Sequence, residues 1–223
     1  MSEPVTQLIK QKLRDSVNKH MTLGATVSAD ELERETLRKA IHMLIAVVPI
    51  LAGLVGATVT LALLAAGTLF YTYTEIVRST GHEVLFISRV TSFASRERDR
   101  GGITHGPITL AIGAMLALLL YPEPIAAIAI YALAFGDGFA SLTGKLFGIH
   151  ELPGTGGKTV EGSSACLVAV TASTFAVSGM LRESLLVGIV AMFVEMLPTR
   201  DFDNLVLPVG VGLVATALFS GLV

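Results

Sequence analysis

Long apolar runs separated by short polar segments make up most of this chain. No charged residue occurs between Lys39 and Glu75. Because a span needs roughly 20 apolar residues, this stretch predicts two transmembrane helices joined by a turn within 49–56. Further apolar runs follow at 104–121, 124–146, 162–180, 183–198 and 204–223. The pattern predicts an all-α, polytopic membrane protein with about seven transmembrane helices.

Two of these runs contain an acidic residue, Asp137 in the fourth and Glu195 in the sixth. Acidic side chains are costly inside a membrane and are usually kept there for function. These two runs therefore match the pattern of a membrane span less well than the other five, and Asp137 is a candidate site residue.

The first 34 residues follow a different pattern. Val5, Leu8 and Val17 fall on one helical face, whereas Lys10 and Arg14 fall on the opposite face. This predicts an amphipathic interfacial segment over 1–34, followed by a transmembrane catalytic domain over 35–223. A loosely ordered soluble arm is the alternative interpretation of the same segment.

Composition supports a membrane protein and indicates its orientation. The chain is 52% hydrophobic and 15% charged, against about 25% charged in soluble domains. Its net charge of −2 gives no support for nucleic-acid binding, and a single cysteine excludes a disulfide framework. Of the 16 Lys and Arg residues, all except Arg182 fall on one predicted face. The positive-inside rule then places the N-terminus and the candidate chemistry on the cytoplasmic side.

Small residues follow Asp137 at near-helical spacing, namely Ala140, Ser141, Gly144 and Gly148. One interpretation is close helix packing, for which Gly144-x-x-x-Gly148 is a typical pattern. The other is a ligand site, because a carboxylate can bind Mg²⁺ and small residues let a ligand approach the backbone. The presence of Asp137 favours the ligand site.

A glycine-rich loop then leads into the next apolar run, with the sequence Pro-Gly-Thr-Gly-Gly-Lys-Thr over 153–159. It is not a P-loop, because Leu152 stands where that motif has its first glycine. Its physics is nevertheless suited to phosphate: glycine amides and a helix N-terminus attract anions, and Lys158 adds a positive charge. Glu161 in the first turn suits metal binding or proton abstraction. Alternatively, it is a first-turn charge that favours the helix dipole.

Together these segments resemble a known family signature. The pattern Asp137-x-x-Ala140-x-x-x-Gly144-x-x-x-Gly148, followed after eight residues by Gly157-Lys158-Thr159-x-Glu161-Gly162, is similar to the CTP-binding signature of the dolichol kinase family. That family includes polyprenol and phytol kinases and CTP-dependent diacylglycerol kinases, and it is distantly similar to phosphatidate cytidylyltransferases. The family pattern has two lysines before the threonine, and here Gly157 replaces the first.

Weaker similarities extend over most of the chain. They are Arg38-Lys39-x-x-His42 at the first span, Glu75-x-x-Arg78 at the end of the second, the segment from Glu97 to Gly106 containing His105, and Asp203-Asn204. Arg38 and Lys39 are otherwise ordinary snorkelling residues, and His42 a packing histidine. The five histidines show no metal-ligand spacing, which makes a zinc site improbable, and His150 has no companion.

The resemblance implies a CTP-dependent lipid kinase that transfers the γ-phosphate to the hydroxyl group of a polyprenol, dolichol, phytol or diacylglycerol. It implies Mg²⁺ or another divalent cation, held by Asp137 with Glu161 or Asp203. The implied catalytic residues are Asp137, Lys158, Glu161 and His42. The implied CTP-binding residues are Arg38, Lys39, Ala140, Ser141, Gly144, Gly148, Gly156, Gly157, Thr159, Gly162 and Asn204. Glu75, Arg78, Glu97 and His105 are implied in supporting roles.

The expected partners are the nucleoside triphosphate, the lipid alcohol and the bilayer itself, without nucleic acid, and a homodimer is left open. Two alternatives remain at this stage. The first is a phosphatidate cytidylyltransferase, which uses the same triphosphate cradle but releases pyrophosphate. The second, of another class, is an ion-coupled membrane transporter, against which the clustering of polar groups at one face argues.

Overall fold

The computed structural model describes residues 29–80, 103–199 and 202–221, and the chain from Arg34 onward forms one compact unit. Most of the predicted interfacial segment, 1–28, lies outside the described residues, as does Glu97.

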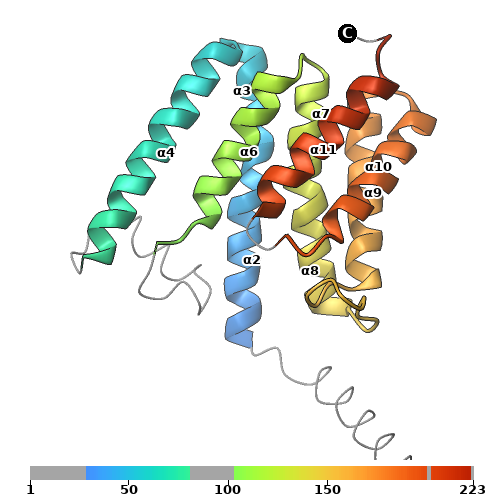
Figure 1. Cartoon of the computed structure of the whole chain (residues 1–223), viewed down its shortest axis with the longest axis horizontal. Coiled ribbons are helices and arrows are strands. Elements are labelled where there is room, and N and C mark those ends of the chain that lie inside the picture. Colours follow the sequence, from blue (N-terminus) through green and yellow to red (C-terminus); the bar gives the residue numbers. More distant parts are fainter. Residues whose placement is uncertain (1–28, 81–102, 200–201, 222–223) are drawn as a thin grey trace, which may run out of the picture. The chain divides into compact units, whose positions relative to one another are not determined.

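The described part of the chain is built from helices and contains no strand. Seven helical stretches follow one another (Figure 1). Three of them are composite or long: α2 (Ala29–Met43) with η1 (Leu44–Ala46) and α3 (Val47–Val55); α4 (Ala57–Ser79); and α7 (Ile125–Tyr131) with η3 (Ala132–Asp137) and α8 (Gly138–Phe147). The others are α6 (Gly106–Leu120), α9 (Val160–Ser178), α10 (Leu181–Glu195) and α11 (Asp203–Leu218).

The prediction of an all-helical membrane protein is confirmed at this level. Four helices are long and apolar enough to cross a membrane: Glu33–Val55, Ala57–Ser79, Ile125–Phe147 and Val160–Ser178. Gly106–Leu120 and Asp203–Leu218 are shorter apolar helices. The number of spans and the side of the N-terminus stay predictions.

The first two helices show how the sequence sets local geometry. Pro49 lacks the N–H that would bond the carbonyl of Ile45, and the chain is locally tightened into the 3₁₀ segment η1 just before it. The chain then turns at Gly56, whose φ of 90° suits glycine. The turn therefore lies at Gly56, the last residue of the predicted range 49–56.

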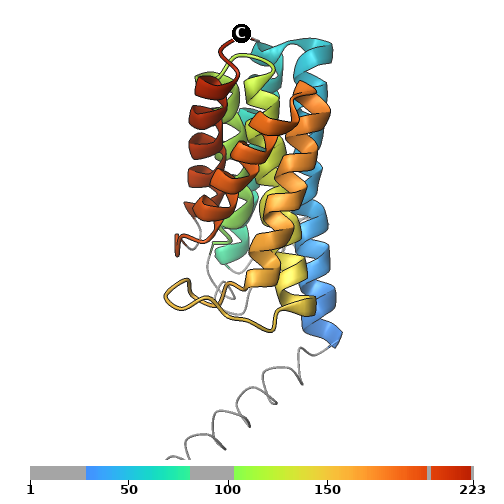
Figure 2. The same cartoon turned by 90° about the vertical axis from the view of Figure 1, so that its right-hand side faces the viewer.

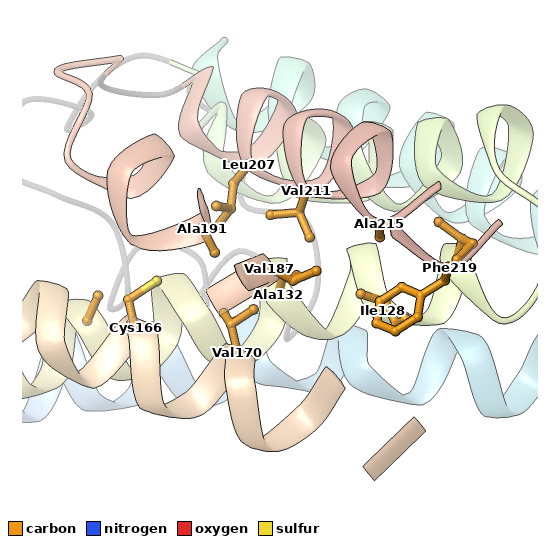
Figure 3. Close-up of a cluster of buried hydrophobic side chains, with 12 residues drawn as sticks. Ile128, Ala132, Cys166, Val170, Val187, Ala191, Leu207, Val211, Ala215 and Phe219 are labelled. Atoms are coloured by element: carbon orange, nitrogen blue, oxygen red, sulfur yellow. The ribbon is translucent and has the colours of Figure 1, made fainter. Parts of the chain in front are cut away.

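The helix from α7 to α8 runs through the centre of the bundle and is the most buried of the four candidate spans. Side chains from this helix, α9, α10 and α11 meet in one apolar cluster (Figure 3). The cluster includes Ile128, Val170, Val187, Val211 and Phe219, each at most 1% exposed. By contrast, α4 carries large exposed apolar side chains such as Leu69 and Phe70, as expected of a helix that faces lipid.

Glycines on either side of Asp137 let two other helices approach the central one. A Cβ atom on Gly136 would lie 2.8 Å from a methyl of Val170 on α9. One on Gly138 would lie 2.6 Å from the terminal methyl of Met43 on α2. Asp137 thus sits where α9 and α2 are both in close contact with the central helix. This point is also the end of the widened π-helical turn η3, a feature often found at functional sites.

Candidate functional site

A buried ion pair joins α2 to the central helix. The ammonium of Lys39 donates a hydrogen bond to Oδ2 of Asp137, and Nε2 of His42 lies 3.2 Å from the same oxygen. The three side chains are between 7% and 11% exposed. Because Lys39 and His42 are three residues apart, they lie on the same face of α2. Three residues that the sequence assigned to separate roles are therefore in direct contact.

His42 also binds the backbone of the π-helical turn. Its Nε2 lies 3.0 Å from the carbonyl oxygen of Leu133 in η3. A carbonyl oxygen only accepts, so Nε2 must carry the proton in this contact, which leaves Nδ1 as the acceptor nitrogen of the neutral ring. The packing interpretation of His42 is thus correct in part, since the ring is hydrogen-bonded within the bundle. It is equally a neighbour of Asp137.

A second ion pair lies at the start of α9. The ammonium of Lys158 is 3.1 Å from Oε1 of Glu195, the last residue of α10, and it also donates to the backbone carbonyl of Glu195. Ser163 on α9 donates to Oε2 of the same carboxylate over 3.3 Å. Lys158 therefore points into the bundle, and its side chain is 22% exposed.

The two ion pairs and Asp203 lie within electrostatic range of one another. The charge of Lys158 acts on Asp137, and the charges of Asp137, Lys39 and Lys158 all act on Asp203. We call Lys39, His42, Asp137, Lys158, Glu195 and Asp203 the inner cluster. It draws on α2, η3, the loop before α9, α10 and α11, and its carboxylates outnumber its lysines by three to two.

A neighbouring set of contacts fixes α2 to α8 beside the inner cluster. The buried carboxylate of Glu35 accepts from Arg38, from Ser141 over 2.7 Å and from Lys145 over 2.9 Å. Ser141 and Arg38, both predicted to bind CTP, thus share one carboxylate. A buried carboxylate requires this kind of compensation by donors and cations.

The glycine-rich loop projects from the end of the bundle where α8 ends and α9 begins (Figure 2), and backbone hydrogen bonds join its two ends. The Leu152 amide donates to the Lys158 carbonyl over 2.8 Å, and the Val160 amide to the His150 carbonyl over 2.9 Å. Gly156 and Gly157 have φ values of 77° and 97°. In the described part of the chain their amides enter none of these backbone bonds. This arrangement suits the predicted capture of an anion.

The stripe of small residues packs helices together. Thr159 caps α9 by accepting from the Gly162 amide over 3.1 Å. Its hydroxyl occupies the space left by two glycines, because a Cβ on either Gly144 or Gly148 would lie 3.0 Å from it. A Cβ on Gly162 would lie 2.6 Å from the carbonyl oxygen of Ala140. The packing interpretation therefore accounts for this stripe, and nucleotide contacts by these residues stay a prediction.

Glu161 lies in a different environment from the other predicted metal ligands. Its carboxylate is 2.7 Å from Nδ1 of His150 and accepts from the His150 amide over 3.3 Å. The statement that His150 has no companion is therefore wrong, because the loop folds back and brings residue 150 beside residue 161. Glu161 therefore joins the two ends of the glycine-rich loop through His150.

The predicted magnesium site fits only in part. Among the residues that the structure describes, no three His, Cys, Asp or Glu side chains are grouped closely enough to hold a metal. Mg²⁺, however, is commonly held by one or two carboxylates together with substrate phosphates and water. Asp137 is paired with Lys39 and His42, and Glu161 with His150, so binding of a metal by either carboxylate would require it to exchange these partners.

The remaining predicted residues support the framework. The side-chain amide of Asn204 donates to Thr109 on α6 over 2.9 Å, and thereby joins α11 to α6. Glu75 accepts from Arg78 at 2.7 and 3.0 Å and from the amide of Thr104 at 2.7 Å, which fixes the approach to α6. His105 is the N-cap residue of α6 but makes no side-chain capping bond.

Two carboxylates that organise the site, Glu35 and Glu195, lie outside the sequence motifs that predict it. Glu35 was not assigned a role, although its position three residues before Arg38 is a recognisable pairing signal. Glu195 was noticed as an acid in an apolar run but was left out of the site. Since α9 and α10 are joined by a short turn at Gly179, the end of α10 must return to the start of α9, where Lys158 lies.

The structure thus defines a helical membrane protein with a buried, charged site at one end of its bundle. Curated relatives of the chain are plant lipid-alcohol kinases. A probable chloroplastic phytol kinase of Triticum aestivum is 30% identical over 144 residues, 56% of this chain and 48% of the relative. A probable phytol kinase 3 of Glycine max is 28% identical over 200 residues, 82% of this chain and 63% of the relative. A chloroplastic farnesol kinase of Arabidopsis thaliana is 30% identical over 142 residues, 56% and 46% of the two chains.

These homologues confirm the resemblance to the polyprenol and phytol kinase family, at modest identity over a sizeable part of the chain. The chain spans about half the length of the curated relatives it matches: 48%, 63% and 46% of the three named here. No protein-family model matches the chain, and no solved structure matches it significantly.

Proposed function

We propose that this protein is a membrane lipid-alcohol kinase, which transfers the γ-phosphate of a nucleoside triphosphate to the hydroxyl group of a lipid alcohol. The observation that carries the proposal is the inner cluster. It pairs Lys39 with Asp137, and it holds Lys158, at the end of the glycine-rich loop, within electrostatic range of the same carboxylate. The curated relatives named phytol kinase and farnesol kinase support the same class of reaction.

In the proposed reaction, the hydroxyl oxygen forms a bond to the γ-phosphorus and the bond to the β–γ bridging oxygen breaks. The hydroxyl proton passes to His42 or to a carboxylate of the inner cluster. Catalysis of such a transfer rests mainly on positioning and on offsetting the charge of the phosphate oxygens. Lys158 and the amides of Gly156 and Gly157 are suited to bind the triphosphate.

A divalent cation is part of the proposal for an electrostatic reason. The carboxylates of the inner cluster outnumber its lysines, so the cluster would repel a bare triphosphate. Mg²⁺ held by Asp137 and Asp203 would offset this charge and polarise the phosphoryl oxygens.

We propose CTP as the donor, because of the family signature, and a long-chain prenyl alcohol as the acceptor, because of the relatives' names. A lipid substrate can enter between helices from the bilayer without leaving it. The active face is proposed to be cytoplasmic from the distribution of Lys and Arg.

The test is phosphorylation by purified protein in detergent micelles with γ-labelled CTP or ATP and excess Mg²⁺. The acceptors are phytol, farnesol, a longer polyprenol and diacylglycerol, and the Lys158→Ala variant is the control. We expect labelled lipid phosphate from at least one prenyl alcohol, with CTP the better donor. Faster transfer from ATP would refute the choice of CTP alone, and no labelled lipid from any acceptor would refute the kinase.

The proposed orientation is tested separately. In a Cys166→Ser background, a single cysteine at Thr155 should react with a membrane-impermeant thiol reagent from the cytoplasmic side only. One at Glu123, at the opposite end of the central helix, should react from the other side only. Reaction of both cysteines from the same side would refute this topology.

A further inference from the structure

Glu195 holds the lysine that the proposed function assigns to the triphosphate. Two of the contacts made by the Lys158 ammonium go to this one residue, to its carboxylate and to its backbone carbonyl. The Glu195 side chain is 9% exposed, and Ser163 fixes its other carboxylate oxygen. A buried carboxylate needs a counter-ion, and here that counter-ion is Lys158.

The same lysine cannot be fully available to two anions. A phosphate group that approaches Lys158 competes with Glu195 for the ammonium and is repelled by the Glu195 carboxylate. An ammonium has three N–H donors, however, so contact with the carbonyl can persist while a phosphate oxygen replaces the carboxylate. Glu195 therefore both positions the Lys158 ammonium and lowers its affinity for phosphate.

We infer that Glu195 is a positioning residue that acts through Lys158: it is the resident counter-ion that keeps the ammonium inside the bundle and gives it up when a triphosphate binds. This inference rests on the proposed function, since that function assigns Lys158 to the phosphates. It adds a residue to the site and a counter-ion exchange to the binding step.

If this exchange occurs, neutralising Glu195 should strengthen phosphate binding, whereas loss of a residue that contacts the phosphate would weaken it. Glu195→Gln keeps the backbone carbonyl and an oxygen that accepts from Lys158, but it removes the competing charge. We expect it to bind inorganic tripolyphosphate more tightly, by roughly tenfold. It should also lower KM for the nucleotide. A residue that only stabilised the fold would not lower KM.

The experiment is calorimetric titration of the full chain in detergent with inorganic tripolyphosphate. The proteins are the wild type, Glu195→Gln, Lys158→Met and the double variant. If Glu195 acts through Lys158, Glu195→Gln tightens binding clearly more in the wild-type background than beside Lys158→Met, where only the direct repulsion of the phosphate by Glu195 is lost. Glu183→Gln is the matched control, because it makes the same substitution at the opposite end of α10. We expect it to leave binding unchanged.

A second variant keeps the test valid if Glu195→Gln does not fold. Glu195→Asp retains the charge but withdraws the carboxylate by one methylene, and we expect it to tighten binding by a smaller factor. Unchanged or weaker binding in whichever of these variants folds would overturn the inference, as would an equal effect beside Lys158→Met. Lipid phosphorylation by the wild type is measured in parallel. Its absence alongside a normal exchange would refute the proposed function and not the role of Glu195.

Discussion

Breaking the buried pair between Lys39 and Asp137 should destabilise the bundle. In Lys39→Met, the Asp137 carboxylate stays buried and, among the described residues, keeps His42 as its one side-chain partner. Leaving one partner of a buried ion pair uncompensated typically costs about 3–5 kcal/mol. The side chains are 7% and 11% exposed, so solvent screens the pair little. The full range therefore applies to the free energy of unfolding.

The double variant separates pairing from packing. In Lys39→Met with Asp137→Asn, no buried charge is left without its partner. We expect it to be more stable than the sum of the two single effects predicts, by at least about 2 kcal/mol. The matched control, Arg182→Met, removes an exposed charge on α10 and should change stability by less than about 0.5 kcal/mol.

The chain offers its own probe for this measurement. Cys166 is the single cysteine and is fully buried beside the central helix. The rate of its reaction with a thiol reagent in micelles therefore reports opening of the bundle, once it is divided by the rate in protein unfolded in SDS. A destabilisation of about 3 kcal/mol corresponds to roughly 100-fold faster reaction. Additive effects of the two substitutions would refute the idea that this pair joins α2 to the central helix.

Three further outcomes are expected. Lys158→Ala should lower the rate of phosphoryl transfer by roughly 10²- to 10³-fold. Because it leaves the buried Glu195 carboxylate without its counter-ion, it should also speed the Cys166 reaction; retention of a tenth of wild-type activity would contradict the role of Lys158 in phosphoryl transfer. Glu161→Gln and His150→Ala should each lower activity roughly tenfold, and the double variant should lose about as much as either single variant. Additive losses would indicate that Glu161 has an independent role, such as metal binding. Gly162→Ala should destabilise the protein by about 1–3 kcal/mol, because its Cβ would lie 2.6 Å from the Ala140 carbonyl oxygen. Gly53→Ala, with open space around the new Cβ, should leave stability unchanged. Equal Cys166 reactivity in the two variants would contradict the packing explanation.

The positions of the helices were predictable because apolar residues recur over the length of a span. Asp137 could be identified as a site residue for the same reason, since a carboxylate in such a run is costly. What the sequence could not provide is its partner. Lys39 precedes Asp137 by 98 residues, and their contact depends on how α2 packs against Gly138. That packing is a tertiary feature without a local signal.

The glycines show a different limit. Gly144-x-x-x-Gly148 was compatible with both packing and ligand binding, and only the position of Thr159 against both glycines shows that packing uses this space. Glu161 was assigned to metal or proton transfer from its place in the motif. Its contact with His150 depends on the loop folding back, which spacing alone did not reveal.

The central claim is that this site transfers the terminal phosphate of a nucleoside triphosphate to a lipid alcohol. The most direct measurement uses CTP labelled in parallel at the α- or the γ-phosphorus, incubated with the purified protein, Mg²⁺ and phytol, farnesol, polyprenol or phosphatidate, followed by analysis of the lipid and nucleotide products. A kinase places the γ-label in the lipid and releases CDP. If the α-label enters a lipid and pyrophosphate is released, the protein is a cytidylyltransferase; if neither label enters a lipid, it does not modify these lipids. Either result would contradict the account.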